Sequence, residues 1–156
     1  MVSLGEILSE KSKKKMILPT IKSGDIFRMK LTEKEGITPK NKGDIDRNKY
    51  FVVIHKTIDD TIIGFLVINT NINHNLSETL QMLHYPISAK KYSFLKNDSF
   101  IYCGELKEIS SDTFVEKYKN ESFGCLDSED MKYIIDALLD SPIETDKHLK
   151  KFGIKE

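Results

Sequence analysis

Two neighbouring apolar runs, rich in β-branched and aromatic residues, constrain the fold more than any other feature of this sequence. The first run, residues 50–55, reads YFVVIH and is typical of a buried central strand. A polar turn at Asp59-Asp60 separates it from a second run at residues 61–68. This pattern predicts an antiparallel β-hairpin at the centre of a sheet.

Further short strands are expected on both sides of this hairpin. Residues 26–31 follow a Ser23-Gly24-Asp25 turn, and residues 99–103 and 106–109 are apolar runs bounded by polar turns. Residues 85–87 are expected to be extended, because Tyr85 precedes a proline and so avoids the helical region. Residues 71–84 are compatible with either a helix or a loop. A short helix is expected at residues 115–119, with its entry at residues 111–114.

A helix over residues 128–139 has the clearest helical pattern. Asp127 or Ser128 can cap its first turn, and Ser141-Pro142 ends it. The apolar side chains recur at helical spacing and form one stripe that we expect to face the core: Met131, Ile134, Ile135, Leu138 and Leu139.

These elements predict one domain over residues 1–156, mainly β with appended helices, in the form of a small β-barrel or sandwich. Residues 1–20 are interpreted as an N-terminal extension, with a short helix and a solvated lysine cluster. Residues 24–141 form the barrel with its helices, and residues 142–156 are a charged tail, in which we expect residues 144–156 to fray.

Composition excludes several classes of protein. The 24 basic and 24 acidic residues give a net charge of zero, which excludes a strongly basic coat for nucleic acid but leaves a local basic face open. No apolar run approaches the roughly 20 residues of a membrane span, so we expect a cytoplasmic protein without a membrane partner. Cys103 and Cys125 are expected to be buried free thiols, although a disulfide between them stays open.

Polar residues at strand ends are the candidate functional site. Arg47 precedes the first strand of the hairpin and Asn69 follows the second, so both lie at the open end of the hairpin. An arginine there can bind a phosphate through two hydrogen bonds, which suggests a site for an RNA backbone. The alternative is that Arg47 caps a sheet edge or pairs with Asp44 or Asp46. No metal-ligand spacing or nucleotide-binding loop is present in the sequence.

The order of these pieces resembles the MazF/PemK family of toxin endoribonucleases. Gly24-Asp25 before an apolar strand, Arg47 before the strand YFVVI, and a segment KKYSFLKNDS at residues 90–99 follow the family's order, and a helix with an acidic cap closes it. The resemblance covers residues 24–141.

This resemblance implies an SH3-like barrel, a symmetric homodimer and metal-independent cleavage of single-stranded RNA, with no cofactor and with an antitoxin protein as partner. By position, Arg47 would stabilise the transition state, and Asn69 or Thr70 would be the second catalytic residue. The side chains expected to contact RNA are Asn48, Lys49, Asn71, Lys40 and Lys42.

The sequence departs from the family at three places. The catalytic hydroxyl position falls on Asn69, with Thr70 one residue later on the opposite face of a strand. Asn48 replaces the proline that follows the arginine, and the loop at residues 32–46 is longer. Two hypotheses therefore stay open: a diverged endoribonuclease, or a non-catalytic SH3-like barrel that binds nucleic acid or a partner protein. An unrelated small enzyme is the remaining alternative.

Overall fold

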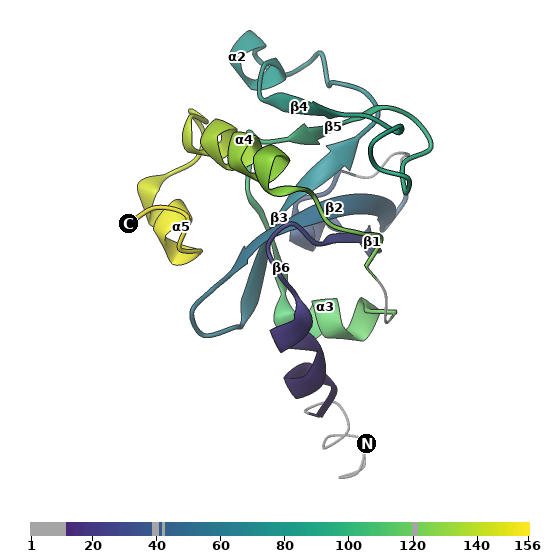
Figure 1. Cartoon of the computed structure of the whole chain (residues 1–156), viewed down its shortest axis with the longest axis vertical. Helices are drawn as coiled ribbons and strands as arrows, with labels where there is room; N and C mark the ends of the chain where they lie inside the picture. The colour runs from purple at the N-terminus through teal and green to yellow at the C-terminus, as the bar shows by residue number, and fades with distance from the viewer. Residues whose placement is uncertain (1–11, 39–40, 42, 120–121) are drawn as a thin grey trace.

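The computed structural model describes residues 12–38, 41, 43–119 and 122–156, and contains a six-stranded antiparallel sheet with helices packed on it (Figure 1). The strands are β1 (Ile26–Leu31), β2 (Arg47–Lys56), β3 (Ile62–Asn69), β4 (His84–Ile87), β5 (Ser99–Tyr102) and β6 (Lys107–Ser110). The helices are α2 (Glu78–Gln81), α3 (Ser111–Lys117), α4 (Ser128–Leu139) and α5 (Asp146–Lys151), with 3₁₀ turns η1 (Leu18–Thr20) and η2 (Glu33–Glu35). Residues 12–17 are also helical.

The predicted central hairpin is confirmed. Strands β2 and β3 pair antiparallel with Phe51 opposite Val67, and a bulge interrupts the register between Val53 and His55. The turn between them contains Asp60 in the left-handed region, at φ 58°. An aspartate tolerates this conformation better than most residues, because its short polar side chain bonds locally.

Strand β3 belongs to two layers of the sheet. The strand order is β1-β2-β3-β5-β4, and β6 also pairs with β3. The first part of β3, from Ile62 to Phe65, pairs with β6, whereas Ile68 and Asn69 pair with β5. Strand β3 therefore joins one part of the sheet, with β1, β2 and β6, to a second part, with β4 and β5, and these parts are here called the two layers (Figure 1).

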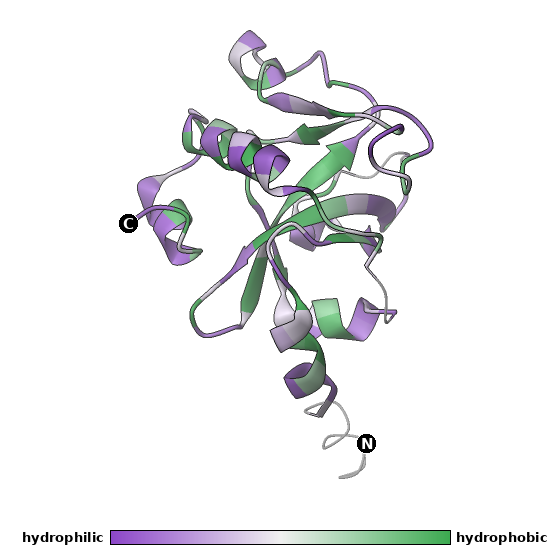
Figure 2. Cartoon of the chain, viewed as in Figure 1, coloured by the Kyte–Doolittle hydropathy of each residue, from purple (hydrophilic) through white to green (hydrophobic). Residues whose placement is uncertain are grey.

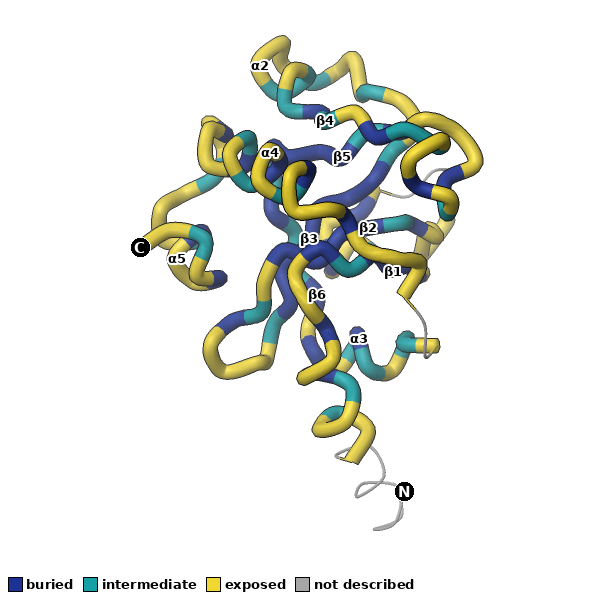
Figure 3. The backbone as a smooth tube through the Cα atoms, in the orientation of Figure 1, coloured by how far each residue is buried: buried dark blue, intermediate teal, exposed yellow. Residues whose placement is uncertain are grey.

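Two hydrophobic cores lie on opposite faces of the central hairpin, because side chains alternate along each strand. The α4-side core includes Val52, Leu66 and Ile134, and the α3-side core includes Phe51, Phe65 and Phe114. Figure 2 shows hydrophobic residues along β3 and hydrophilic residues at α2 and α5. Figure 3 shows that the buried residues concentrate where β3 crosses the other strands.

The sheet does not close into a barrel, so this part of the predicted fold class needs correction. Among the described residues, no strand pairing joins β1 to β6 or to β4. Two lysine side chains connect β6 and α3 to the region of β1 and η2 instead. Lys107 of β6 donates a hydrogen bond to the carbonyl of Gly36 at 2.8 Å, and Lys117 of α3 donates to the carbonyl of Lys30. The coarser prediction, β strands with appended helices, is confirmed.

The C-terminal segment contains a helix that packs on the core, contrary to the expectation that residues 144–156 fray. Thr145 caps α5 by accepting a hydrogen bond from the backbone N–H of His148 at 3.1 Å. Leu149 and Phe152 are buried in the α4-side core. The ring of Phe152 packs over Gly64 so closely that a Cβ there would lie 3.0 Å from it. Glycine at this position of β3 is therefore required by the close approach of the ring.

The two cysteines differ in environment, so the expectation of two buried thiols is only half right. Cys103 is buried, and burial raises the pKa of its thiol to about 12. Cys125 is exposed because its segment lies along the outer edge of the sheet, bridging Asp25. Both thiols are free. No helix of the described chain is long and apolar enough to cross a membrane.

A buried carboxylate fastens the segment before β5 to helix α4. Asp130 is 7% exposed and accepts hydrogen bonds from the Tyr85 hydroxyl at 2.5 Å, from the Tyr92 hydroxyl, and from the Lys91 ammonium at 2.9 Å. Burial raises the pKa of Asp130, but the three donors outweigh it and the net shift is downward from 3.8. Tyr92 is therefore a core residue, and its own pKa rises to about 12 through burial and the Asp130 hydrogen bond.

Replacing Asp130 by asparagine is expected to lower the free energy of unfolding at pH 7 by about 2 kcal/mol, because the buried donors lose an ionised acceptor. A lowered pKa in the folded state stabilises the protein above the unfolded value of 3.8 and ceases to do so as the pH falls through the folded value. Urea unfolding at pH 7 and pH 3 should therefore show a smaller loss of stability on acidification in the variant than in the wild type. Asp136→Asn, at an exposed position of the same helix, is the control. Equal stability of Asp130→Asn and wild type at pH 7 would show that the network contributes nothing.

Candidate functional site

The open end of the β2–β3 hairpin brings together two of the predicted site residues, Lys49 and Asn69. The register that pairs Phe51 with Val67 places Lys49 opposite Asn69, and the Lys49 ammonium donates a hydrogen bond to the Asn69 side-chain oxygen. Arg47 lies two residues before Lys49 at the start of β2. The expectation that Arg47 and Asn69 occupy the same end of the hairpin is therefore confirmed.

Arg47 and Lys49 lie on the same face of the sheet. In the β1–β2 ladder Lys49 is opposite Met29 and Arg47 is opposite Leu31, and both of these partners belong to the α3-side core. The two cations therefore stand at the margin of this core. Arg47 is exposed, whereas Lys49 is only 8% exposed.

Lys49 is a buried cation, and no carboxylate among the described residues pairs with it. Burial, followed by the nearby charges of Arg47 and Lys107, lowers the pKa of Lys49 from 10.5 to about 8. A lysine ammonium has three N–H donors, and within the described residues only Asn69 accepts from it. A buried lysine in such surroundings is incompletely neutralised, and a bound anion would supply both the missing charge and the missing acceptors.

Lys107 is a member of this cationic group that the sequence did not identify. It lies in β6 opposite Phe65 of β3, and its ammonium is 3.5 Å from a Glu105 carboxylate oxygen. In the sequence it is one lysine in a short predicted strand. No pattern in the neighbouring residues indicates that the pairing of β6 with β3 brings Lys107 near Lys49.

The remaining predicted site residues are more dispersed. Thr70 lies one residue beyond the end of β3 and is exposed, and its hydroxyl accepts a hydrogen bond from the Asn71 side-chain amide at 3.5 Å. Asn48 is exposed on the opposite face from Lys49. Lys40 and Lys42 lie outside the described residues. The structure thus brings Lys49 to Asn69 but gives no contact between Thr70 and Arg47 in the described chain.

Positive charge is concentrated on two strands although the whole chain is neutral. Strands β1 and β2 contain no carboxylate, and their cationic side chains are Arg28, Lys30, Arg47, Lys49 and Lys56. No ion pair of Arg47 with Asp44 or Asp46 is found among the described residues. This local basic region is consistent with an anionic ligand such as a nucleic-acid backbone.

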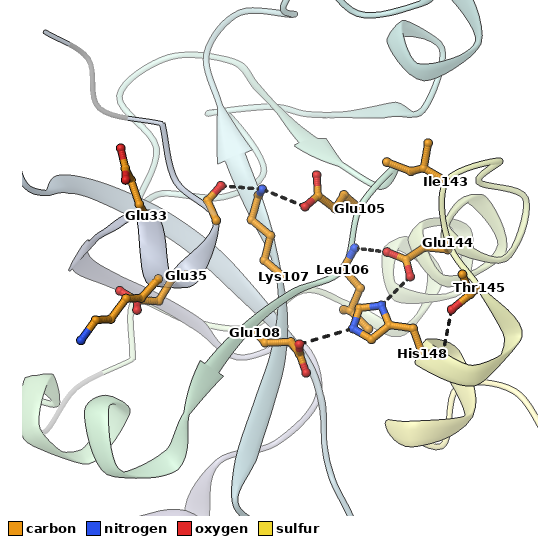
Figure 4. Close-up of a pocket in the computed structure, with 12 residues that line it drawn as sticks. Glu33, Glu35, Glu105, Leu106, Lys107, Glu108, Ile143, Glu144, Thr145 and His148 are labelled. Atoms are coloured by element: carbon orange, nitrogen blue, oxygen red, sulfur yellow. Dashed lines mark hydrogen bonds and ion pairs between the residues drawn. The ribbon is translucent and has the colours of Figure 1, made fainter. Parts of the chain in front are cut away.

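A cleft of about 540 Å³ lies between η2, β6 and the segment that precedes α5 (Figure 4). Several polar groups that line this cleft are joined by hydrogen bonds and ion pairs. Glu144 accepts hydrogen bonds from the Leu106 backbone N–H and binds the His148 ring, each at 2.6 Å, and the other ring nitrogen of His148 is 3.8 Å from Glu108. These contacts attach α5 to β6. Because the lining is rich in glutamate, the cleft is a poor site for RNA.

Comparison of the sequence with models of known protein families and with curated proteins finds no match. The residues at the end of the hairpin provide two cations of different character on one face. Arg47 has an exposed guanidinium that can bind an anion through two hydrogen bonds, and Lys49 has a buried ammonium whose pKa is lowered to about 8.

Proposed function

We propose that this protein is an endoribonuclease that cleaves single-stranded RNA without a metal ion, with the scissile phosphate bound between Arg47 and Lys49. The observation that carries the proposal is the buried Lys49 ammonium, which pairs with no carboxylate in the part of the chain that the structure describes and lies beside two further cations. A phosphate fits this site because it supplies negative charge and several acceptor oxygens at once. The order of sequence motifs that resembles the MazF/PemK family supports the same reaction.

In the proposed reaction, the 2′-oxygen of RNA forms a bond to phosphorus while the bond from phosphorus to the 5′-oxygen breaks. The 2′-hydroxyl proton passes to solvent, and protonated Lys49 donates a proton to the departing 5′-oxygen before solvent reprotonates it. Arg47 holds the non-bridging oxygens, whose negative charge increases in the transition state. Asn69 is a positioning residue, because it accepts the hydrogen bond that orients the Lys49 ammonium.

The proposed relation to the MazF/PemK family concerns the order of the strands and helices along the chain, because the sheet does not close into a barrel. An antitoxin partner, a homodimer, and roles for Thr70, Asn48, Asn71, Lys40 and Lys42 are further parts of the proposal.

Cleavage of a long unstructured RNA by the purified protein in EDTA tests the proposed function. The expected products carry a 2′,3′-cyclic phosphate at one new end and a 5′-hydroxyl at the other. Single-stranded DNA of the same sequence should remain intact, because it lacks the attacking 2′-hydroxyl. Cutting that requires added Mg²⁺, or that proceeds equally on DNA, would contradict the mechanism. Binding of RNA without any cutting would favour the non-catalytic module.

A further inference from the structure

On the opposite face of β2 from Lys49, three aromatic side chains from separate parts of the chain form a cluster, here called the aromatic surface: Tyr50, Phe94 and Phe123. The ring of Tyr50 lies 5.4 Å from that of Phe94 and 5.3 Å from that of Phe123, which it meets edge to face at 87°. Tyr50 and Phe94 are half-buried, whereas Phe123 is 39% exposed. The cluster thus presents one accessible ring, Phe123, that contacts Tyr50, and Tyr50 in turn contacts Phe94.

Phe123 is held on the sheet by backbone hydrogen bonds. Its N–H donates to the carbonyl of Ile26 at 2.8 Å, and the N–H of Ile26 donates to the carbonyl of Gly124 at 2.9 Å. The segment around Phe123 therefore extends the outer edge of β1. An exposed aromatic ring fixed in this way loses little conformational entropy when a flat ligand stacks on it.

Cations border the aromatic surface. The Arg28 guanidinium lies 5.4 Å from the centre of the Tyr50 ring, and Lys30 is exposed two residues farther along β1 on the same face. A cationic strand beside stacking rings is the combination by which proteins bind single-stranded nucleic acid, because the cations contact phosphates and the rings stack on bases. The absence of any carboxylate from β1 and β2 adds to this charge complementarity.

We propose that the aromatic surface is a base-stacking subsite for single-stranded RNA, in which a base stacks on Phe123 and the neighbouring phosphate contacts Arg28 and Lys30. This inference deepens the proposed function and rests on it for the identity of the ligand. A strand rises about 3.3 Å per residue, so Tyr50 and Arg47 are about 10 Å apart along β2, but their side chains lie on opposite faces of the strand. One RNA chain occupies both sites only if it passes around the start of β2, where Arg47 is exposed.

Binding of two uncleavable oligonucleotides tests the subsite. The first is a 2′-O-methyl oligoribonucleotide of mixed sequence, and the second is the same chain without its bases. Fluorescence anisotropy at fixed salt should show that wild type prefers the first, and that Phe123→Ala weakens its binding about tenfold while leaving the base-free chain unaffected. Phe123→Leu, which keeps an apolar side chain, should weaken binding similarly because it lacks the flat ring.

Tyr133→Ala is the matched control, because Tyr133 is 51% exposed on α4 and stacks on Tyr85 away from the aromatic surface. Unchanged binding by both Phe123 variants, equal weakening for both oligonucleotides, or no binding by wild type would overturn the subsite. Because neither oligonucleotide can be cut, the result is independent of catalysis. If the wild type cleaves RNA and Phe123→Ala binds the first oligonucleotide as tightly as wild type does, only the subsite is refuted. If binding by wild type depends on the bases but ordinary RNA is not cleaved, only the nuclease is refuted.

Discussion

Replacing Lys49 with arginine is expected to lower the rate of RNA cleavage by about 10²–10³-fold while RNA still binds. The guanidinium keeps the positive charge beside Asn69, so attraction to the phosphate persists. It does not release a proton near neutral pH, so the departing 5′-oxygen loses its donor. Single-turnover cleavage and equilibrium binding of an uncleavable RNA separate the two effects.

The pH dependence gives a second readout of the same variant. In wild type, Lys49 is protonated below its pKa of about 8 and loses its charge and its transferable proton above it. Cleavage and binding by wild type should therefore both decline as the pH rises above about 8, with the binding midpoint shifted upward because a phosphate favours the charged form. Binding by Lys49→Arg should be flat over the same range. Cleavage by Lys49→Arg at the wild-type rate would contradict the role of Lys49 as the proton donor.

Replacing Arg47 with alanine is expected to lower cleavage by about 10²–10³-fold with little effect on folding. The guanidinium is the exposed cation of the site and is proposed to hold the oxygens on which charge develops, and loss of one such donor typically has an effect of this size. Its exposed position predicts a thermal unfolding midpoint close to that of wild type. Initial rates on a fluorescent RNA, with thermal unfolding measured alongside, give both quantities.

Two further substitutions sharpen the Arg47 result. Arg47→Lys keeps the charge but loses the two parallel hydrogen bonds, so an intermediate rate is expected. Lys132→Ala removes an exposed cation from α4 and should cut RNA as wild type does. If Arg47→Ala cuts at the wild-type rate, the phosphate does not bind at the end of the hairpin, and the positional resemblance to the MazF/PemK family loses its functional meaning.

Local sequence signals predicted the elements whose structure depends on near neighbours. Helix α4 begins and ends where its cap and apolar stripe indicate, with Asp127 accepting a hydrogen bond from the Asp130 backbone N–H. The central hairpin follows from two apolar runs around one polar turn, and its register brings Asn69 to Lys49. Helix α5 was missed because its one buried residue, Leu149, and the buried Phe152 that follows the helix are isolated in a charged segment.

The side-chain contacts across the open interval between β1 and β6, and the full cationic group, depend on contacts between distant parts of the chain. Lys107 reaches Gly36 across 71 positions, and Lys117 reaches Lys30 across 87. No pattern within a short window encodes such pairs. For the same reason the sequence identified Lys49 as a basic residue near the site but gave no sign that it is buried or that its pKa is lowered.

The position of β3 has a consequence for how the molecule unfolds. Its hydrogen bonds run to β2 on one edge and to β6 and then β5 on the other, so neither layer can detach without breaking bonds of this strand. Side chains of β3 also enter both cores. The two cores therefore melt in one cooperative transition, and the amide protons of β3 are among the last to exchange with deuterated solvent.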